Sequence, residues 1–594
     1  MLNRFIAQTM PTPALTRRGF LKLSAGATGG LMLGAALRPV SAAAQGGVDG
    51  LATPFVHIRP DNTVVVIVKH LDKGQGTATG LATLVADELD ADSAQVTTEF
   101  APANTDLYAN TLMGVQGTGG STAMANSWQQ YREAGATARS MLIAAAAQTW
   151  GVDPAGISIA GGQITDGSQS ASLGDMAETA AGQSVPESVT LKTPDQWVYI
   201  GKSFPRVDVV RKSQGATNMY GMDVAMEGLV YAVSLRSPRF GGVLAGLDAT
   251  EARAMPGVID VIQLPDRATV IAESTWQAIQ ARDALSAEWD FSQAENRGTE
   301  ELRAEYTALL DEEGIAFHSA VVSQADTEQV IEADYSFPYL AHTPMEPIDV
   351  TVRFDGTEAT FWTGSQIQTL DQNIGAQVLG IDPGSVSIET LWGGGSFGRR
   401  AIYDSHYVAE AAMIAKAWLE AHGDARPIKL VWTREDDVRG GYYRPMHMHR
   451  VRAGLDADGN ITSWEQRVVG QGIAIGTAFE QFMVRDGVDA SSVEGLGEHS
   501  AYTIPGWSVD IHHPEVGVPV LWWRSVGHTH TAYVVETMMD ELAEAAGADP
   551  VEFRLRYLTD PRARGVLELA IDKAGTVPDG LTRGIAVHKS FGSY

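Results

Sequence analysis

Residues 391–400, LWGGGSFGRR, decide the interpretation of the whole chain. An alternating apolar segment, residues 385–391, predicts a strand before them, and the Ala-rich run 401–422 predicts a long helix after them. Glycines at this junction leave backbone N–H groups open to a ligand. The helix N-terminus and the guanidinium groups of Arg399 and Arg400 add positive charge. The stretch therefore predicts a site for a phosphate-bearing ligand, with a Gly-rich turn and two solvated arginines as the alternative.

The same arrangement recurs three more times along the chain. The further turns, each followed by an expected helix, are Gly74-Gln75-Gly76 before residues 77–89, Gln116-Gly117-Thr118-Gly119-Gly120-Ser121-Thr122 before residues 124–150, and Trp522-Trp523-Arg524-Ser525-Val526-Gly527 before residues 532–546. Short glycine motifs are weak signals when they stand alone. Four such turns, rich in glycine, hydroxyl or amide groups, predict one extended ligand held from several sides.

The N-terminus has the pattern of an export signal. Arg17-Arg18 begins a twin-arginine pattern, an apolar run follows at residues 25–37, and small residues follow at 40–44. We expect residues 1–44 to be a twin-arginine signal peptide and the protein to be periplasmic; an N-terminal membrane anchor is the alternative. After the leader, no apolar run is long enough to cross a bilayer, so we expect no stable membrane span once the signal is removed.

Charge and cysteine content narrow the function classes. The chain has a net charge of −29, which argues against nucleic acid or anionic lipid as a partner and suits a basic redox partner such as a cytochrome c electron acceptor. It has no cysteine, so we expect no disulfide and no thiolate-bound iron–sulfur cluster in this chain. Any electrons that arrive in this chain must leave through a centre carried elsewhere.

The 594 residues predict a mixed α/β, multidomain protein. After the leader we expect a first folded segment at residues 50–165, a Ser-, Gly- and Pro-rich linker at 166–200, a separate α/β unit at 200–295, and a final part at 325–594. The pattern remains apolar up to Tyr594, so we expect the natural chain to continue beyond it.

Together these motifs resemble the large, molybdenum-binding subunit of the xanthine oxidase family of molybdenum hydroxylases. The resemblance covers about residues 50–594. Within the family, the sequence is most similar in type to the isoquinoline 1-oxidoreductase beta subunit, a group that includes periplasmic aldehyde dehydrogenases. Besides the four turns, it rests on the motifs Tyr220-Gly221-Met222-Asp223-Val224, His342-Thr343-Pro344-Met345-Glu346-Pro347, residues 362–366 and Thr433-Arg434-Glu435-Asp436-Asp437. It implies an α+β multidomain fold in which residues 50–165 form a permuted segment of the molybdopterin-binding domain, 200–295 an α/β hammerhead-like domain, and 325–594 an incomplete molybdopterin-binding domain.

The resemblance also implies a cofactor, molybdopterin cytosine dinucleotide, and its binding residues. Gln366 matches the glutamine that hydrogen-bonds the apical oxo group of molybdenum. The positions implied to line the cofactor are Gln75, Gly76, Gly119, Gly120, Ser121, Thr122, Gly394, Gly395, Ser396, Phe397, Gly398, Arg399 and Arg524. In the family the pterin dithiolene holds the metal, so no protein ligand to molybdenum is expected. Ser396 departs from the pattern, because the family often has a glycine there.

By the same resemblance, the reaction is hydroxylation of an aldehyde or N-heterocycle with water as oxygen donor. A small partner subunit with two [2Fe–2S] clusters is implied as the recipient of the electrons. The family's catalytic base is a glutamate in a glycine-flanked motif, which we expect beyond Tyr594. Gly495-Leu496-Gly497-Glu498 imitates that motif, but its neighbours match an earlier family segment. A non-catalytic exported ligand-binding or scaffold protein is the alternative function.

Several other residues allow two interpretations each. The pairs His447/His449 and His528/His530 are either a copper or zinc site, or histidines that lie on the surface or are hydrogen-bonded. His342 and Glu346 are either parts of a structural turn or a wall of the cofactor cavity. Glu435, Asp436 and Asp437 are either charges at a helix N-terminus or a solvated face, and Trp522 and Trp523 are either core residues or parts of a substrate funnel.

Overall fold

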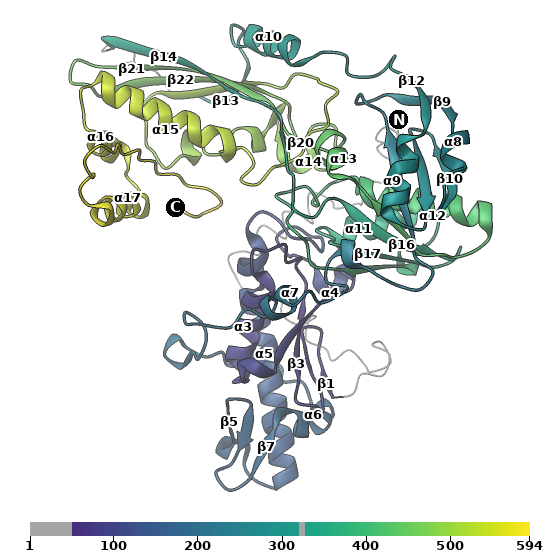
Figure 1. Ribbon diagram of the computed structural model, residues 1–594. Helices are drawn as coiled ribbons and strands as arrows, with labels where there is room; N and C mark the ends of the chain where they lie inside the picture. The colour runs from purple at the N-terminus through teal and green to yellow at the C-terminus, as the bar shows by residue number, and fades with distance from the viewer. Residues whose placement is uncertain (1–49, 320–326) are drawn as a thin grey trace.

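The computed structural model describes residues 50–319 and 327–594. The twin-arginine segment expected at residues 1–44 lies outside the described residues. Figure 1 shows a purple to blue N-terminal body, a teal to green middle body, and a third body in which α15, drawn in yellow, lies along a long sheet. This mixture of helices and strands confirms the expected multidomain α+β class.

The N-terminal body is built on a four-stranded sheet, β1 (Leu51–Ala52), β2 (Val56–Ile58), β3 (Val64–Val68) and β4 (Val96–Phe100), in that spatial order. The β-branched strand β3 is buried and pairs in parallel with β4. Helix α3 (Thr77–Leu89) connects these two strands, and α5 (Thr122–Trp150) packs against α3. The two helices approach at Gly135, where a Cβ would lie 2.8 Å from the Val85 carbonyl oxygen.

The expectation of a linker at residues 166–200 is wrong. Strand β7 (Ser170–Ser172) completes a small sheet with β5 (Ser158–Ala160) and β6 (Gln163–Thr165), and α6 (Leu173–Ala181) follows directly. Leu173 is fully buried in the core of the N-terminal body, and Lys192 Nζ pairs with Asp90 at 2.6 Å. The Ser, Gly and Pro residues form turns between short packed elements, which is why the sequence has no clear periodicity there.

The middle body is organised around a seven-stranded sheet of spatial order β10-β11-β8-β19-β16-β17-β18. Its strands are β8 (Val230–Arg236), β10 (Val258–Leu264), β11 (Arg267–Ala272), β16 (Asp349–Phe354), β17 (Ala359–Thr363), β18 (Val386–Thr390) and β19 (Ile428–Val431). Three of them come from residues 200–295, so the sheet crosses the boundary predicted for a separate α/β unit. The crossing is the parallel pairing of Ile428 with Val230. The domain bounds taken from the family resemblance remain a prediction.

A buried ion cluster reinforces this joint between the two sequence segments. Glu410 lies on α12 (His406–His422) and pairs with Arg236 at 2.5 Å and with Arg267 at 2.8 Å. Burial by itself would raise the pKa of Glu410, but the two arginines lower it to about 2. Glu410 is therefore ionised and ties α12 to strands β8 and β11.

The third body is a five-stranded sheet of order β13-β25-β22-β21-β14, with α15 (His528–Ala545) packed on β14 and β21 (Figure 1). Its strands are β13 (Ile315–His318), β14 (Gln329–Phe337), β21 (His447–Leu455), β22 (Ile461–Gly470) and β25 (Trp507–His512), and the helices α16 (Pro550–Tyr557) and α17 (Pro561–Ala574) follow α15. The remaining elements are α4 (Thr105–Tyr108), α7 (Val209–Ser213), β9 (Val243–Asp248), α8 (Thr250–Arg253), α9 (Thr275–Asp283), β12 (Ser286–Asp290), α10 (Thr299–Leu309), β15 (Leu340–Ala341), α11 (Gln368–Leu379), α13 (Arg434–Arg439), β20 (Tyr443–Arg444), α14 (Glu480–Met483), β23 (Val484–Arg485) and β24 (Val488–Asp489).

The expected helices after the four turns all form, with one difference that matters for the site. Helix α3 has the bounds predicted for it. Helix α12 begins at His406, five residues later than expected, so the turn at 393–398 does not lie at a helix N-terminus. In the part of the chain that the structure describes, no helix combines the length and apolar character that crossing a membrane requires.

The packing of residues 166–200 can be tested by truncating a side chain. Leu173→Ala should lower the free energy of unfolding by about 2–5 kcal/mol, because it leaves a cavity in a closed core. Val198→Ala, in the same stretch but at a side chain that is 44% exposed, should change it by less than about 0.5 kcal/mol. Urea unfolding followed by tryptophan fluorescence measures both. Equal effects of the two substitutions would contradict the packing described above.

Candidate functional site

The first turn, residues 73–76, is shaped by Asp72. The Asp72 carboxylate accepts the N–H of Gly74 at 2.9 Å and the N–H of Ala78 at 3.0 Å, so it fixes the turn and the start of α3 together. Its backbone carbonyl accepts the N–H of Gly393 at 3.0 Å, which brings the first turn against the third. The Gln75 side chain folds back onto the carbonyl of Leu71 at 2.8 Å. Asp72 was not among the predicted site residues, although an Asp two residues before a glycine is a turn signal.

Gln366 joins the second and third turns. Its Nε2 donates to the Thr118 carbonyl at 2.6 Å, and its Oε1 accepts from the Ser396 hydroxyl at 2.6 Å. The Thr118 N–H donates in return to the Gln366 carbonyl at 2.9 Å. The buried His70 ring connects the second turn to helix α5, with one ring nitrogen 3.1 Å from the Gly117 carbonyl and the other 3.1 Å from the Ser127 hydroxyl. Ser396, which departs from the family pattern, thus takes part in the contact that connects the turns.

The third turn is clamped by Glu346. The Glu346 Oε2 accepts the N–H of Gly394 at 2.7 Å, and the Glu346 N–H donates to the Gly394 carbonyl at 3.0 Å. The neighbouring His342 ring lies within hydrogen-bond distance of the carbonyls of Tyr442 and Trp522, at 3.1 and 3.0 Å. The motif at residues 342–347 is therefore a structural turn that also forms the wall behind the glycines.

The fourth turn closes the ring of contacts. The Arg524 N–H donates to the Phe397 carbonyl at 2.7 Å. Gly398, with φ of 112°, lies so close to the Trp522 carbonyl oxygen that a Cβ would be 2.1 Å from it. Only glycine allows this approach, because any side chain would collide with backbone. All four predicted turns therefore meet at one place, although they lie far apart along the chain.

The donors at this junction that have no protein acceptor are suited to an anion, although the Ser396 residue itself is buried. In the described residues, the backbone N–H groups of residues 395–398 donate to no protein acceptor, and the exposed Arg524 guanidinium has no carboxylate partner. Gly119 is half-buried, Gly120 and Ser121 are exposed, and Thr122 starts α5. Backbone donors in such turns and an exposed arginine are features of anion-binding sites.

The predicted phosphate-facing role of the Arg399 side chain, and of Arg400 beside it, is wrong. Both side chains are 1% exposed or less. The Arg399 Nη2 lies 2.8 Å from His406 Nε2 and its Nε lies 3.5 Å from Asp437, while Arg400 donates to Glu346 at 3.0 Å. The buried carboxylates of Asp437 and Glu346 hold these guanidinium groups inside the protein, away from the surface of the turn. The capping Asp436 of α13 and the buried Asp437 confirm the expected charge cluster at a helix N-terminus.

One histidine from each pair, His449 and His530, belongs to a directed chain of hydrogen bonds. Trp464 can only donate, and its Nε1 lies 3.1 Å from Gln466 Oε1, so the Gln466 amide donates to His449 Nδ1 at 3.1 Å. His449 Nε2 then donates to His530 Nδ1 at 2.8 Å, and the His447 ring stacks on His530 at 3.7 Å. Across residues 50–319 and 327–594, no three or more acidic, histidine or cysteine side chains are grouped to hold a metal ion. The hydrogen-bonded alternative is therefore the one the structure supports.

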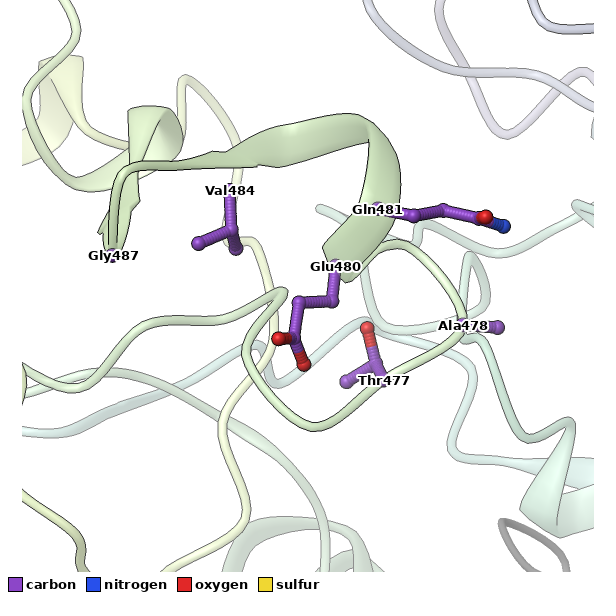
Figure 2. Close-up of a pocket in the computed structure, with 6 residues that line it drawn as sticks. All are labelled: Thr477, Ala478, Glu480, Gln481, Val484 and Gly487. Carbon is purple, nitrogen blue, oxygen red and sulfur yellow. The ribbon is translucent and has the colours of Figure 1, made fainter. Parts of the chain in front are cut away.

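A cavity of about 520 Å³ lies beside the fourth turn. Figure 2 shows its lining residues, Thr477, Ala478, Glu480, Gln481, Val484 and Gly487. Phe479 in the same segment packs against Trp522, with ring centroids 5.4 Å apart. Trp522 and Trp523 are half-buried, so they are not closed core residues. Glu498, the imitation of the base motif, is 74% exposed, and its carboxylate lies 3.9 Å from the His499 ring.

The buried histidine chain predicts acid sensitivity. Burial lowers the pKa of His449 to about 3 from its ordinary 6.5, so between these values the unfolded chain binds more protons than the folded chain. The stability that depends on neutral His449 is present above pH 6.5 and declines as the pH falls toward 3. Between pH 7 and 5, the melting temperature of the wild type should fall more steeply than that of His449→Gln. The exposed His499→Gln should follow the wild type; parallel curves for wild type and His449→Gln would contradict the prediction.

Comparisons with known proteins find one class of domain in two parts of this chain. Two models, both described as molybdopterin cofactor-binding domains, match residues 313–558 and residues 24–226. A membrane-bound aldehyde dehydrogenase [pyrroloquinoline-quinone] of Gluconacetobacter polyoxogenes is 28% identical over 92% of this chain and 72% of its own length. The beta subunit of isoquinoline 1-oxidoreductase from Brevundimonas diminuta is 27% identical over 94% and 77%. A nicotinate dehydrogenase subunit from Pseudomonas putida is 26% identical over 88% and 44%.

Solved structures are similar at lower identity. The aldehyde oxidoreductase of Desulfovibrio gigas has a TM-score of 0.49 at 16% identity, over 87% of this chain and 57% of that chain. The quinoline 2-oxidoreductase of Pseudomonas putida 86 has a TM-score of 0.49 at 19% identity, over 62% and 53%. This chain thus spans little more than half the length of these structures. Since the two molybdopterin-binding models together match most of its residues, the chain belongs to the xanthine oxidase family of molybdenum hydroxylases, as a molybdopterin-binding large subunit.

Proposed function

We propose that this chain is the catalytic, molybdenum-binding subunit of a hydroxylase or dehydrogenase that oxidises an aldehyde or an N-heterocycle. The names of its relatives support this range of substrates, because they include an aldehyde dehydrogenase and an isoquinoline oxidoreductase. When bound, the cofactor supplies a two-electron redox centre at which a substrate carbon gains an oxygen atom from water. The convergence of the four turns, two of which Gln366 joins directly, is the observation that carries the proposal.

The residues at the junction fit a pterin with a pyrophosphate tail. The free N–H groups of residues 395–398 and the Arg524 guanidinium are the donors that would hold the phosphates. Gly119, Gly120 and Ser121 leave the backbone of the second turn accessible on the same junction. We propose the cytosine dinucleotide form of the cofactor, because a dinucleotide is long enough to engage turns from several sides.

Gln366 would orient the cofactor by its amide. One N–H of its Nε2 is held by the Thr118 carbonyl, and in the described residues no protein acceptor takes the second N–H. The Ser396 hydroxyl holds the amide oxygen, so the amide cannot rotate to exchange its donor and acceptor. The second N–H is thus directed by the protein and has no acceptor among the described residues. The glutamate base expected beyond Tyr594 remains a prediction.

The partners follow from the electron balance of such a reaction. Two electrons leave the substrate, and this chain has no cysteine for an iron–sulfur cluster. We therefore propose a small subunit with two [2Fe–2S] clusters as the recipient, and a cytochrome c as a candidate further acceptor because the chain is strongly acidic. The twin-arginine pattern supports a periplasmic location, since that pathway exports proteins that have already folded around a cofactor.

The cofactor content of the purified protein tests the proposal. Co-expression with cofactor maturation enzymes should give about one molybdenum and one CMP, released by hydrolysis, per chain. Arg524→Ala should retain several-fold less of both after gel filtration, because it removes the exposed cation of the fourth turn. Arg564→Ala, at an exposed arginine of α17, should retain as much as the wild type. Absence of both molybdenum and CMP from the wild type would favour the scaffold alternative.

Gln366→Ala tests the orienting role. The variant should lose most of the turnover of aldehydes or N-heterocycles in the full-length enzyme while it retains molybdenum, because the phosphate donors are unchanged. The loss should be about tenfold or more, the effect typical of a positioned hydrogen-bond donor. Gln183→Ala, on the surface of the N-terminal body, is the control. A Gln366→Ala enzyme as fast as the wild type would show that the reaction takes place elsewhere.

A further inference from the structure

The carboxyl group of Glu494, which the proposed reaction does not use, contacts the end of the fourth turn. The Glu494 Oε2 accepts the N–H of Gly527 at 3.0 Å, at the point where the turn passes into α15. The Glu494 carbonyl accepts the hydroxyl of Thr531 at 2.7 Å, one turn further along the helix. Glu494 therefore holds both ends of the first helical turn that follows Arg524.

The turn needs such support because its backbone is strained. Ser525 and Val526 have φ values of 69° and 49°, in the left-handed region, and a β-branched residue there is a genuine outlier. Residues in this region keep their conformation only where the surrounding structure enforces it. The segment of residues 489–497 packs closely against the end of this turn, because a Cβ on Gly527 would lie 2.3 Å from the Ser491 carbonyl oxygen.

We propose that Glu494 is the positioning residue that holds the Arg524 turn, residues 524–527, in its cofactor-binding shape, and that ionisation of its carboxyl group loosens the turn. The inference rests on the proposed function, because it takes Arg524 as a donor to the cofactor. Glu494 acts through Gly527 and needs no contact with the cofactor itself.

The surroundings of Glu494 favour its neutral form. Its side chain is 26% exposed, and the neighbouring carboxyl of Asp489 disfavours a second negative charge. The other titratable groups that face it in the described residues are His528 on α15, whose Nε2 is 3.9 Å away, and His588, whose Nε2 lies 2.8 Å from His528 Nδ1. Burial lowers the pKa of His528 to about 4 and also lowers that of His588, so neither is expected to supply a counter-charge near neutral pH.

The direction of the pH effect follows from the pKa of the Glu494 carboxyl group in the closed and in the open turn. Burial raises the pKa of Glu494 to about 7 from its ordinary 4.5, against the lowering effect of the Gly527 N–H. A neutral carboxyl still accepts this N–H through its carbonyl oxygen. Once the turn opens, Glu494 returns to water and to its ordinary pKa, so the closed turn binds more protons than the open one between pH 4.5 and 7. The closed turn is therefore most stable at the acid end of this range and least stable above pH 7.

The same segment connects the turn to the cavity of Figure 2. Asp489 accepts the N–H of Ala474 at 2.7 Å and the N–H of Ser491 at 2.9 Å. Residues 477–487, which line the cavity, lie between these two anchoring points in the sequence.

Hydrogen–deuterium exchange of the full-length chain without cofactor tests the proposal independently of activity. The readout is the protection of a peptide that covers residues 524–530, corrected for the intrinsic effect of pH on exchange. In the wild type, protection should fall by about tenfold or more from pH 5 to pH 8. Glu494→Gln keeps an acceptor that does not ionise, so its protection should be the same at both pH values. Glu494→Ala has no acceptor and should be poorly protected at both.

Glu544→Gln, which removes an exposed carboxyl from the last turn of the same helix, should behave as the wild type does. Protection in Glu494→Ala as high as in the wild type, or a pH dependence in Glu494→Gln equal to that of the wild type, would overturn the proposal.

Retention of molybdenum and CMP by the loaded protein gives a second measurement. The wild type should lose both faster at pH 8 than at pH 5, and Glu494→Gln should lose them equally slowly at both. If the wild type never contains molybdenum or CMP, the proposed function fails, whereas the exchange experiment still decides the role of Glu494. If the wild type is loaded and Glu494→Gln follows its pH dependence, only the role of Glu494 fails.

Discussion

The site depends on the Gln366 amide and its two hydrogen bonds. These bonds span 248 residues to Thr118 and 30 residues to Ser396, so one side chain sets the spacing of the second and third turns. Gln366 is 2% exposed, and the loss of either partner would leave a buried polar group unsatisfied, at a cost of about 1–3 kcal/mol. The amide is also asymmetric, with a donor on one side and an acceptor on the other. The contact therefore fixes an orientation as well as a distance.

The charged side chains around the third turn point into the protein interior. Arg399 and Arg400 are buried against Asp437 and Glu346. Beside them, burial is the main cause that raises the pKa of Asp349, and electrostatic repulsion from Glu346 is the second. A buried ion pair holds its neighbours firmly, since breaking it leaves an uncompensated charge. The rigid turn then presents backbone N–H groups, and the exposed Arg524 supplies the positive charge at its surface. An anion at this junction would meet preorganised donors rather than flexible side chains.

Much of the fold could be predicted from local pattern. The bounds of α3, and the existence of the helices after all four turns, follow from residue periodicity and from the turn residues before them. The segment at residues 166–200 could not be assigned in this way, because its elements are short and acquire their buried face only against the rest of the N-terminal body. The shared seven-stranded sheet could not be predicted either, because the pairing of Ile428 with Val230 joins two segments that are distant in sequence and has no local sequence signal.

The sequence by itself identified the four turns that meet in the structure, the acidic character of the chain, its lack of cysteine, and the family whose motifs it shares. These properties depend on composition and on order along the chain. Only the tertiary structure decided that Arg399 points inward while Arg524 stays exposed, that Asp72 and Glu346 clamp the turns, and that Glu494 supports a strained one. The direction in which a side chain points is set by the partner that compensates its charge or its hydrogen-bonding groups, and here those partners are mostly remote in sequence.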